Sequence, residues 1–160
     1  VMVLGIPNVG KSTFINKVAK RKAAKTEDRP GVTRSKQWVP VDKTLELLDT
    51  PGILWPKFDD PQVGIRLAYT GAVKDEILDM EELACSLLEY LSSHYPQAIT
   101  QRYGVELQPE ESGYMILQRL GKKRGFLISG GEVNTERMAQ VFLDEFRSGR
   151  MGRFSLEEPE

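Results

Sequence analysis

The residues most able to do chemistry begin with positions 5–12, of sequence GIPNVGKS. They fit the phosphate-loop pattern of a glycine, any four residues and then Gly-Lys-Ser. In such a loop the backbone N–H groups cradle nucleotide phosphates, the lysine reaches the β- and γ-phosphates, and the serine holds Mg²⁺. We therefore expect a nucleoside triphosphate site, with Lys11 as a catalytic cation and Ser12 as a Mg²⁺ ligand. The expected nucleotide-binding residues of this loop are Asn8, Val9, Gly10, Lys11, Ser12 and Thr13.

A second chemical signal follows an apolar strand, where Asp49-Thr50-Pro51-Gly52 begins a turn. A carboxylate at the carboxyl end of a strand can hold Mg²⁺ through water, which assigns Asp49 to the metal. The Gly52 N–H can reach the γ-phosphate, and we expect Gly52 to serve nucleotide binding and catalysis.

The polar loop at 28–34 contains Thr33 after a Pro-Gly turn. We expect Thr33 to complete the Mg²⁺ shell only when the γ-phosphate is present, so that it binds nucleotide and metal and contributes to catalysis as part of a switch. An ordinary turn residue is the alternative interpretation of Thr33. The basic run at 20–25 is interpreted as a solvated helix end, where cations complement the helix dipole.

Secondary structure must bring these groups together. Residues 1–4 are an apolar run typical of a buried strand, residues 12–21 are expected to be helical, and 37–41 and 44–48 are expected to be strands joined by a turn at 42–43. The fold class expected over residues 1–58 is therefore an α/β P-loop nucleotide-binding fragment with a partial doubly wound sheet.

The pattern becomes helical after Asp59-Asp60-Pro61. Apolar residues then recur at three- and four-residue spacing, and Ser, Asn, Asp, Pro and Gly stand at positions that start or stop helices. We expect a small all-α domain over residues 59–160. The first of its helices is predicted from a cap at Asp60 or Asp59, with Pro61 at its first position, to about 73. The others are predicted from a cap at Asp75 to about 95, at 96–103, at 112–120, and from a cap at Asn134 to before Gly149.

Composition excludes several classes of protein. The 22 Lys and Arg against 23 Asp and Glu exclude a histone-like polycation, and a single cysteine, Cys85, excludes an intramolecular disulfide and a multi-cysteine zinc site. No apolar run approaches the roughly 18 residues of a membrane span, and no signal peptide is visible. We expect a soluble cytoplasmic protein without a membrane or DNA partner.

Taken together, the motifs at 5–12, 30–33 and 49–52 resemble those of the translation-factor-related GTPases, and residues 7–12 are typical of their Era-like branch. Residues 49–58, 130–133 and 144–153 resemble the ribosome biogenesis GTPase A family, whose G domain is circularly permuted. This resemblance covers essentially the whole chain, and it implies that residues 1–58 are an α/β P-loop GTPase fragment of a circularly permuted G domain. It implies GTP and GDP as ligands, Mg²⁺ as cofactor, and a role in late assembly of the large ribosomal subunit with the helical domain on ribosomal RNA. In related GTPases an asparagine at the position of Asn8 helps to hold K⁺, which implies the same ion here.

Two departures modify these expectations. The guanine-reading motif Asn-Lys-x-Asp is absent from the sequence, so we expect guanine-reading segments that precede the phosphate loop; a degenerate nucleotide site is the alternative. Ile53 follows Gly52 where Ras-like enzymes have a water-orienting glutamine. We therefore expect hydrolysis to be slow until the ribosomal subunit stimulates it.

Two basic clusters are candidates for RNA binding, because backbone phosphates attract exposed cations. A solvated charged surface is the alternative interpretation. For the whole chain, the alternatives are a non-catalytic, nucleotide-gated RNA-binding module and a mitochondrial ribosome-assembly relative. The candidate RNA-binding residues are Lys122, Lys123, Arg124, Arg147, Arg150 and Arg153.

Overall fold

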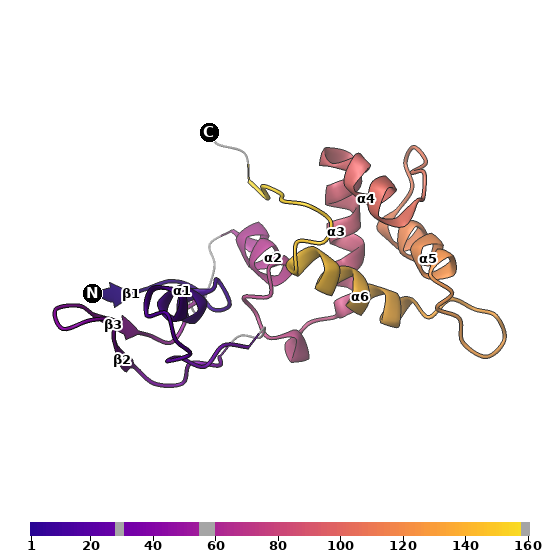
Figure 1. The fold of residues 1–160 in the computed structure, drawn as a ribbon. Helices are drawn as coiled ribbons and strands as arrows, with labels where there is room; N and C mark the ends of the chain where they lie inside the picture. Colours follow the sequence, from indigo (N-terminus) through magenta and orange to yellow (C-terminus); the bar gives the residue numbers. More distant parts are fainter. Residues whose placement is uncertain (28–30, 55–59, 158–160) are drawn as a thin grey trace. The chain divides into compact units, whose positions relative to one another are not determined.

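The computed structural model describes residues 1–27, 31–54 and 60–157, and the chain forms two compact units, Val1–Lys74 and Asp75–Glu160. Figure 1 shows the strands and the first helices in the first unit and the remaining helices in the second. The predicted P-loop fragment followed by helices is confirmed as the fold class. No helix in the described ranges is long and apolar enough to cross a membrane.

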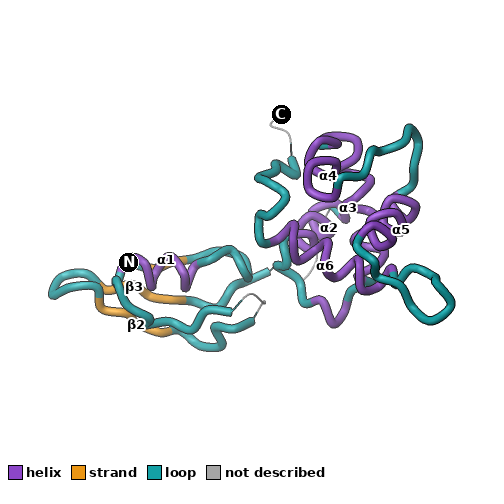
Figure 2. The backbone as a smooth tube through the Cα atoms, turned by 45° about the vertical axis from the view of Figure 1, so that its right-hand side comes forward, coloured by secondary structure: helices purple, strands orange, loops and turns teal. Residues whose placement is uncertain are grey.

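The first unit is built on a three-stranded sheet with strand order β1-β3-β2. β1 (Met2–Val3) is parallel to β3 (Glu46–Asp49), whereas β2 (Gln37–Pro40) is antiparallel to it. The register places Met2 and Trp38 on either side of Leu48. Helix α1 (Lys11–Val18) lies along this sheet, as Figure 2 shows, and closes a small core of Ile15, Val39 and Leu47.

Helix α1 is shorter than predicted, since it ends at Val18 and not at 21. Asn16 explains the early end. Its side-chain Oδ1 accepts hydrogen bonds from the backbone N–H groups of Ala23 and Ala24, at 2.9 and 2.8 Å, and its Nδ2 donates to Ala24 O at 2.8 Å. An asparagine that bonds nearby backbone in this way competes with helical hydrogen bonds and turns the chain.

Helix α2 (Pro61–Tyr69) begins as predicted, with Asp60 as its N-cap and Pro61 in its first turn. The Asp60 carboxylate accepts a hydrogen bond from the Gln62 N–H at 2.8 Å. The helix ends at Tyr69, before the predicted 73, because Gly71 follows with a φ of 73°. The first compact unit includes α2 and continues to Lys74, while a functional boundary at residue 58 stays a prediction.

The second unit packs three α-helices around α3 (Met80–His94), which contacts α4 (Pro96–Tyr103), α5 (Gly113–Lys123) and α6 (Thr135–Arg147). The predicted starts at Pro96, Ser112 and Asn134 are confirmed. The largest fully covered side chains of this unit are apolar. They include Leu87, Leu88, Leu91, Leu117, Leu120, Phe142 and Leu143.

The predicted cap of α3 at Asp75 is wrong. Asp79 caps this helix, and its carboxylate accepts hydrogen bonds from the N–H groups of Glu81 and Glu82 at 3.0 Å each. Asp75 instead begins the short 3₁₀ helix η1 (Asp75–Ile77). Its carboxylate is held by Arg147 through two hydrogen bonds of 2.8 and 2.9 Å, an interaction that sequence spacing does not reveal.

The start of α5 lies tightly against α3 at Gly113. A Cβ atom at this position would overlap the backbone carbonyl of Cys85. The Gly113 N–H donates to the Glu89 carboxylate at 2.9 Å, which satisfies one of the free donors at the start of α5. Glycine is therefore required for packing here.

A buried carboxylate, Glu145, joins three helices of the second unit. It is 4% exposed and accepts hydrogen bonds from Arg102 Nε at 3.0 Å, Tyr103 OH at 2.8 Å and Arg124 Nη2 at 3.1 Å. The Arg102 hydrogen bond is the main reason that the pKa of Glu145 falls to about 2, against an opposing effect of burial. Burial raises the pKa of Tyr103 far above its ordinary value, so this hydroxyl stays a donor.

Candidate nucleotide-binding site

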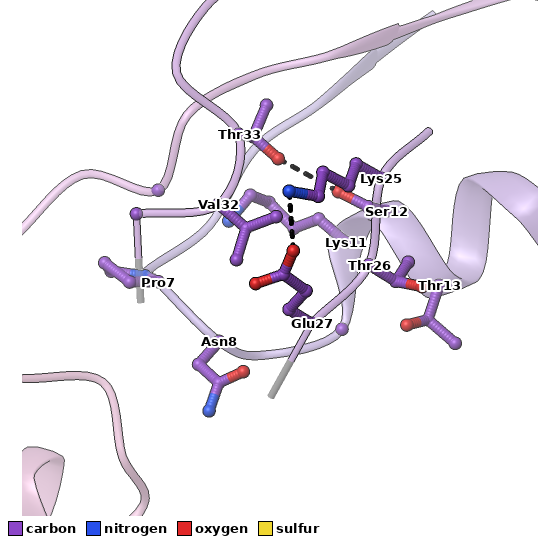
Figure 3. Close-up of a pocket in the computed structure, with 13 residues that line it drawn as sticks. Pro7, Asn8, Lys11, Ser12, Thr13, Lys25, Thr26, Glu27, Val32 and Thr33 are labelled. Carbon is purple, nitrogen blue, oxygen red and sulfur yellow. Dashed lines mark hydrogen bonds and ion pairs between the residues drawn. The ribbon is translucent and has the colours of Figure 1, made fainter. Parts of the chain in front are cut away.

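A cavity of about 390 Å³ lies over the phosphate loop in the first unit. Figure 3 shows the side chains that surround it, from the loop, from α1 and from the segment that precedes β2. Of the predicted nucleotide-binding residues, the lining includes Asn8, Gly10, Lys11, Ser12, Thr13, Thr33 and Gly52. Val9 is exposed and does not line this cavity.

The loop backbone adopts the turn that the sequence predicts between β1 and α1. Asn8 has a φ of 57° and Gly10 a φ of 86°, and Gly10 is the N-cap of α1. Asparagine and glycine are the residues that enter this left-handed region most readily. No side chain among the described residues caps the helix, so the N–H groups of its first turn are available to an anion, which the helix dipole also favours.

Lys11 provides the cation of the loop. Its Nζ donates to the carbonyl of Ile6 at 2.8 Å, which holds the side chain back over the loop that precedes it. Burial lowers the pKa of Lys11 from its ordinary value, and the nearby Asp49 carboxylate opposes that effect. A phosphate in the cavity would satisfy the ammonium group more fully than the carbonyl does, because charge-assisted hydrogen bonds are the stronger kind.

Ser12, Thr33 and Asp49, the three predicted Mg²⁺ ligands, lie together. The Ser12 hydroxyl donates to Asp49 Oδ2 at 2.8 Å, and its oxygen lies 3.2 Å from Thr33 Oγ1. Asp49 is 1% exposed, and its other oxygen, Oδ1, is buried without a hydrogen-bond partner among the described residues. Buried polar atoms almost always have partners, and hard cations prefer carboxylate and hydroxyl oxygens. The donor set therefore fits Mg²⁺.

Gly52 brings the turn after β3 against the phosphate loop. A Cβ atom at this position would lie 2.5 Å from the Cα of Pro7, and the Ile53 N–H donates to Gly5 O at 3.4 Å. The neighbouring Thr50 is buried and fixes the turn by donating from its hydroxyl to Val3 O at 2.7 Å. Only a residue without a side chain allows this approach. Ile53 is 69% exposed and offers no polar atom to a water.

Residues 25–27 line the cavity, although the basic run that ends with Lys25 was interpreted as a solvated helix end. The Lys25 Nζ lies 2.6 Å from Glu27 Oε1, and Figure 3 shows this ion pair beside Thr26. Their position depends on the Asn16 contacts to Ala23 and Ala24. The sequence signal for this position was a polar residue on the first helix followed by a basic and an acidic residue. That pattern is too common to predict that Lys25 and Glu27 line the cavity.

The candidate RNA-binding residues divide into two groups in the second unit. Lys122, Lys123, Arg150 and Arg153 are exposed. Arg147 has a side chain only 9% exposed and bound to Asp75. Arg124 is also exposed, but it donates to Glu145 and lies over the Tyr103 ring, 5.2 Å from its centre. These contacts favour a structural role for Arg124 and Arg147.

Comparison with known proteins gives consistent results. Ribosome biogenesis GTPase A of Bacillus licheniformis is 51% identical over 99% of this chain and 56% of its own length. The protein of the same name from Thermotoga maritima is 30% identical over 100% of this chain and 56% of its own length. A GDP-bound structure of YlqF matches with a TM-score of 0.65 at 28% identity, over 99% of this chain and 61% of the other. A GNP-bound structure of YlqF from T. maritima matches with a TM-score of 0.62 at 28% identity, over 100% of this chain and 59% of the other.

The chain thus spans about half the length of the curated relatives it matches. The resemblance to the ribosome biogenesis GTPase A family is confirmed at this level of identity. The family model described as 50S ribosome-binding GTPase matches residues 1–108, which is more than half of the sequence. The chain belongs to the family of 50S ribosome-binding GTPases.

Proposed function

We propose that the chain binds Mg²⁺ and GTP in the phosphate-loop cavity and that the whole protein hydrolyses GTP to GDP and phosphate. The observation that carries this proposal is the convergence of Ser12, Thr33 and Asp49 beside Lys11 in a cavity at a helix N-terminus. Family membership supports GTP over other triphosphates. The sequence contains no Asn-Lys-x-Asp segment to read the guanine.

Each residue has a distinct part in this proposal. Ser12 and Thr33 would ligate Mg²⁺ directly, and Asp49 would orient its shell from the buried side. When bound, the metal would neutralise charge that develops on the β- and γ-phosphate oxygens. Lys11 would bind the same oxygens, and the Gly52 N–H would hold the γ-phosphate. Asn8 lines the cavity, where it would help to hold a K⁺ ion that offsets the same charge.

Ile53 supports a slow basal rate, because an exposed aliphatic side chain cannot orient the attacking water. GTP hydrolysis by the whole protein, with and without large ribosomal subunits, and in K⁺ or Na⁺ buffer, tests the enzyme. We expect stimulation by the subunits and a dependence on K⁺. An unchanged, slow rate in all four conditions would contradict hydrolysis as the function.

The second unit would dock on ribosomal RNA during late maturation of the large subunit, in the cytoplasm. Lys122, Lys123, Arg150 and Arg153 support this part of the proposal, because they remain exposed while Arg124 and Arg147 are engaged. Replacing Lys122 and Lys123 by alanine removes two cations. If both contact phosphates, the magnitude of the negative slope of log affinity against log salt should fall by about 1.4–1.8. An unchanged slope would exclude both from the interface.

A non-catalytic, nucleotide-gated RNA-binding module is the second candidate, and the exposed Ile53 is the observation that favours it. Lys11→Ala separates the two. An enzyme requires turnover, so the variant should lose GTP hydrolysis and subunit assembly together. A module that binds RNA independently of nucleotide would retain its assembly function after this change. A nucleotide-gated module would lose that function but would act in assembly with a non-hydrolysable GTP analogue, whereas an enzyme that requires turnover would not.

A further inference from the structure

The backbone that leads into residues 25–27 is held by two side chains. Asn16, from α1, makes three hydrogen bonds of 2.8–2.9 Å to the backbone of Ala23 and Ala24. Gln37, from β2, adds a hydrogen bond from its Nε2 to Ala23 O at 3.0 Å. Ala24 is itself buried. Helix and sheet therefore both fix the point from which Lys25 starts, immediately beside the cavity.

Lys25 and Glu27 occupy the same cavity as the phosphate loop. The ammonium and carboxylate groups lie 2.6 Å apart, and their side chains are 71% and 31% exposed. A carboxylate in this cavity opposes the entry of a polyanion, whereas the lysine attracts it. Exposed ion pairs are weak, so phosphate oxygens that carry more negative charge can replace the carboxylate as the partner of Lys25.

We propose that Lys25 is a further nucleotide-binding residue, which exchanges the Glu27 carboxylate for a phosphate oxygen when nucleotide enters the cavity. Glu27 is then an internal competitor that weakens nucleotide binding. Asn16 is a positioning residue, because it acts through the backbone on which both side chains stand. This inference rests on the proposed function, since it concerns the same cavity and the same ligand.

Isothermal titration of the whole protein with Mg²⁺ and GTP tests the exchange. Lys25→Met should weaken binding about tenfold, the loss of one charge-assisted contact. Glu27→Gln should tighten binding about threefold, and this gain should largely disappear in the Lys25→Met background. Lys22→Met is the matched control, because Lys22 is an exposed lysine of the same segment that does not line the described cavity.

Equal affinities of Lys25→Met and Lys22→Met would overturn the inference. The inference would also be overturned if Glu27→Gln increased the nucleotide affinity equally in the Lys25→Met background, because Glu27 would then act by simple repulsion of the phosphates. Magnesium tripolyphosphate serves as a second probe, since it offers phosphates without a base. The Lys25→Met loss should recur with it, and a loss confined to GTP would contradict a phosphate contact.

Lys11→Ala keeps this inference separate from the proposed function. The further inference alone fails if three results occur together. These are that the unchanged protein binds GTP, that Lys11→Ala abolishes this binding, and that Lys25→Met has no effect on it. If the unchanged protein binds neither probe, both proposals fail together.

Discussion

Glu145→Gln tests how the second unit is held together. Glu145 is 4% exposed and accepts hydrogen bonds from Arg102, Tyr103 and Arg124, which come from α4 and from the end of α5. Glutamine keeps the size of the side chain and imitates its protonated form. The substitution therefore removes the charge with little change in packing.

The pKa of Glu145 gives the magnitude of the effect. Hydrogen bonds from Arg102 are the main cause that lowers it from 4.5 to about 2. At 1.36 kcal/mol per pH unit, this difference corresponds to about 3 kcal/mol of stability for the charged form. A loss of that size agrees with the low end for breaking a buried ion pair, about 3 kcal/mol. The low end is appropriate because the side chains of Arg102 and Arg124 are 32% and 34% exposed.

The pH dependence has a definite sign. The unfolded chain protonates Glu145 near pH 4.5, whereas the folded unit does so only near pH 2. The contribution of the carboxylate is therefore complete above pH 4.5 and is lost as the pH falls through the folded pKa. Between the unchanged protein and Glu145→Gln we expect a difference in unfolding free energy of about 3 kcal/mol at pH 7 that narrows toward zero near pH 2.

Urea unfolding followed by the helical circular dichroism signal measures this difference. Gln140→Ala is the matched control, because Gln140 is an exposed residue of the same helix. If Glu145→Gln unfolds at the same urea concentration as Gln140→Ala at pH 7, the carboxylate does not stabilise the unit. A gap of equal size at pH 7 and pH 3 would show that the effect is not the loss of the charge.

Two further predictions concern packing and the metal. Gly113→Ala places a Cβ atom against the Cys85 carbonyl and should lower the free energy of unfolding by about 1–3 kcal/mol, which is measured as a lower melting temperature. An unchanged melting temperature would mean that α3 and α5 separate freely here. Asp49→Asn removes the negative charge beside Ser12 and Thr33, so Mg²⁺ should enhance GTP binding at least tenfold less than in the unchanged protein. Titrations with Mg²⁺ and with a chelator measure that ratio, and an equal ratio in both proteins would remove Asp49 from the metal site.

Local signals account for most of what the sequence predicted. The phosphate loop, the turn that starts at Asp49 and the helix caps at Ser112 and Asn134 are short patterns whose chemistry depends on adjacent residues. The α3 cap was misassigned because it depends on a residue that is distant in the sequence. Asp75 and Asp79 both precede the apolar repeat, and the choice between them depends on Arg147, which binds Asp75 from another helix. A single sequence does not contain that contact.

The same reasoning explains why the sequence did not show which basic residues are exposed and which are bound to carboxylates. Counting cations cannot separate Arg147, whose charge is bound to Asp75, from Arg150, which is exposed, because the distinction lies in tertiary partners. Nor could the pattern reveal that Lys25 faces the cavity. That position depends on the side chain of Asn16, which lies on the helix before it and bonds to the backbone two residues earlier.

The two units differ in how they satisfy their charges, and this difference indicates where chemistry can occur. In the second unit Glu145 has three donor residues, and Asp75 receives two hydrogen bonds from Arg147, so a ligand would have to break existing contacts. In the first unit Asp49 keeps a buried oxygen without a described partner, and Lys25 is paired through an exposed contact. Charges that are positioned but incompletely bonded cost stability and gain from a ligand, which is the condition for a binding site. The exposed cations of the second unit, Lys122, Lys123, Arg150 and Arg153, lie outside this internal network, so a ligand that binds them need not break the contacts of Glu145 or Asp75.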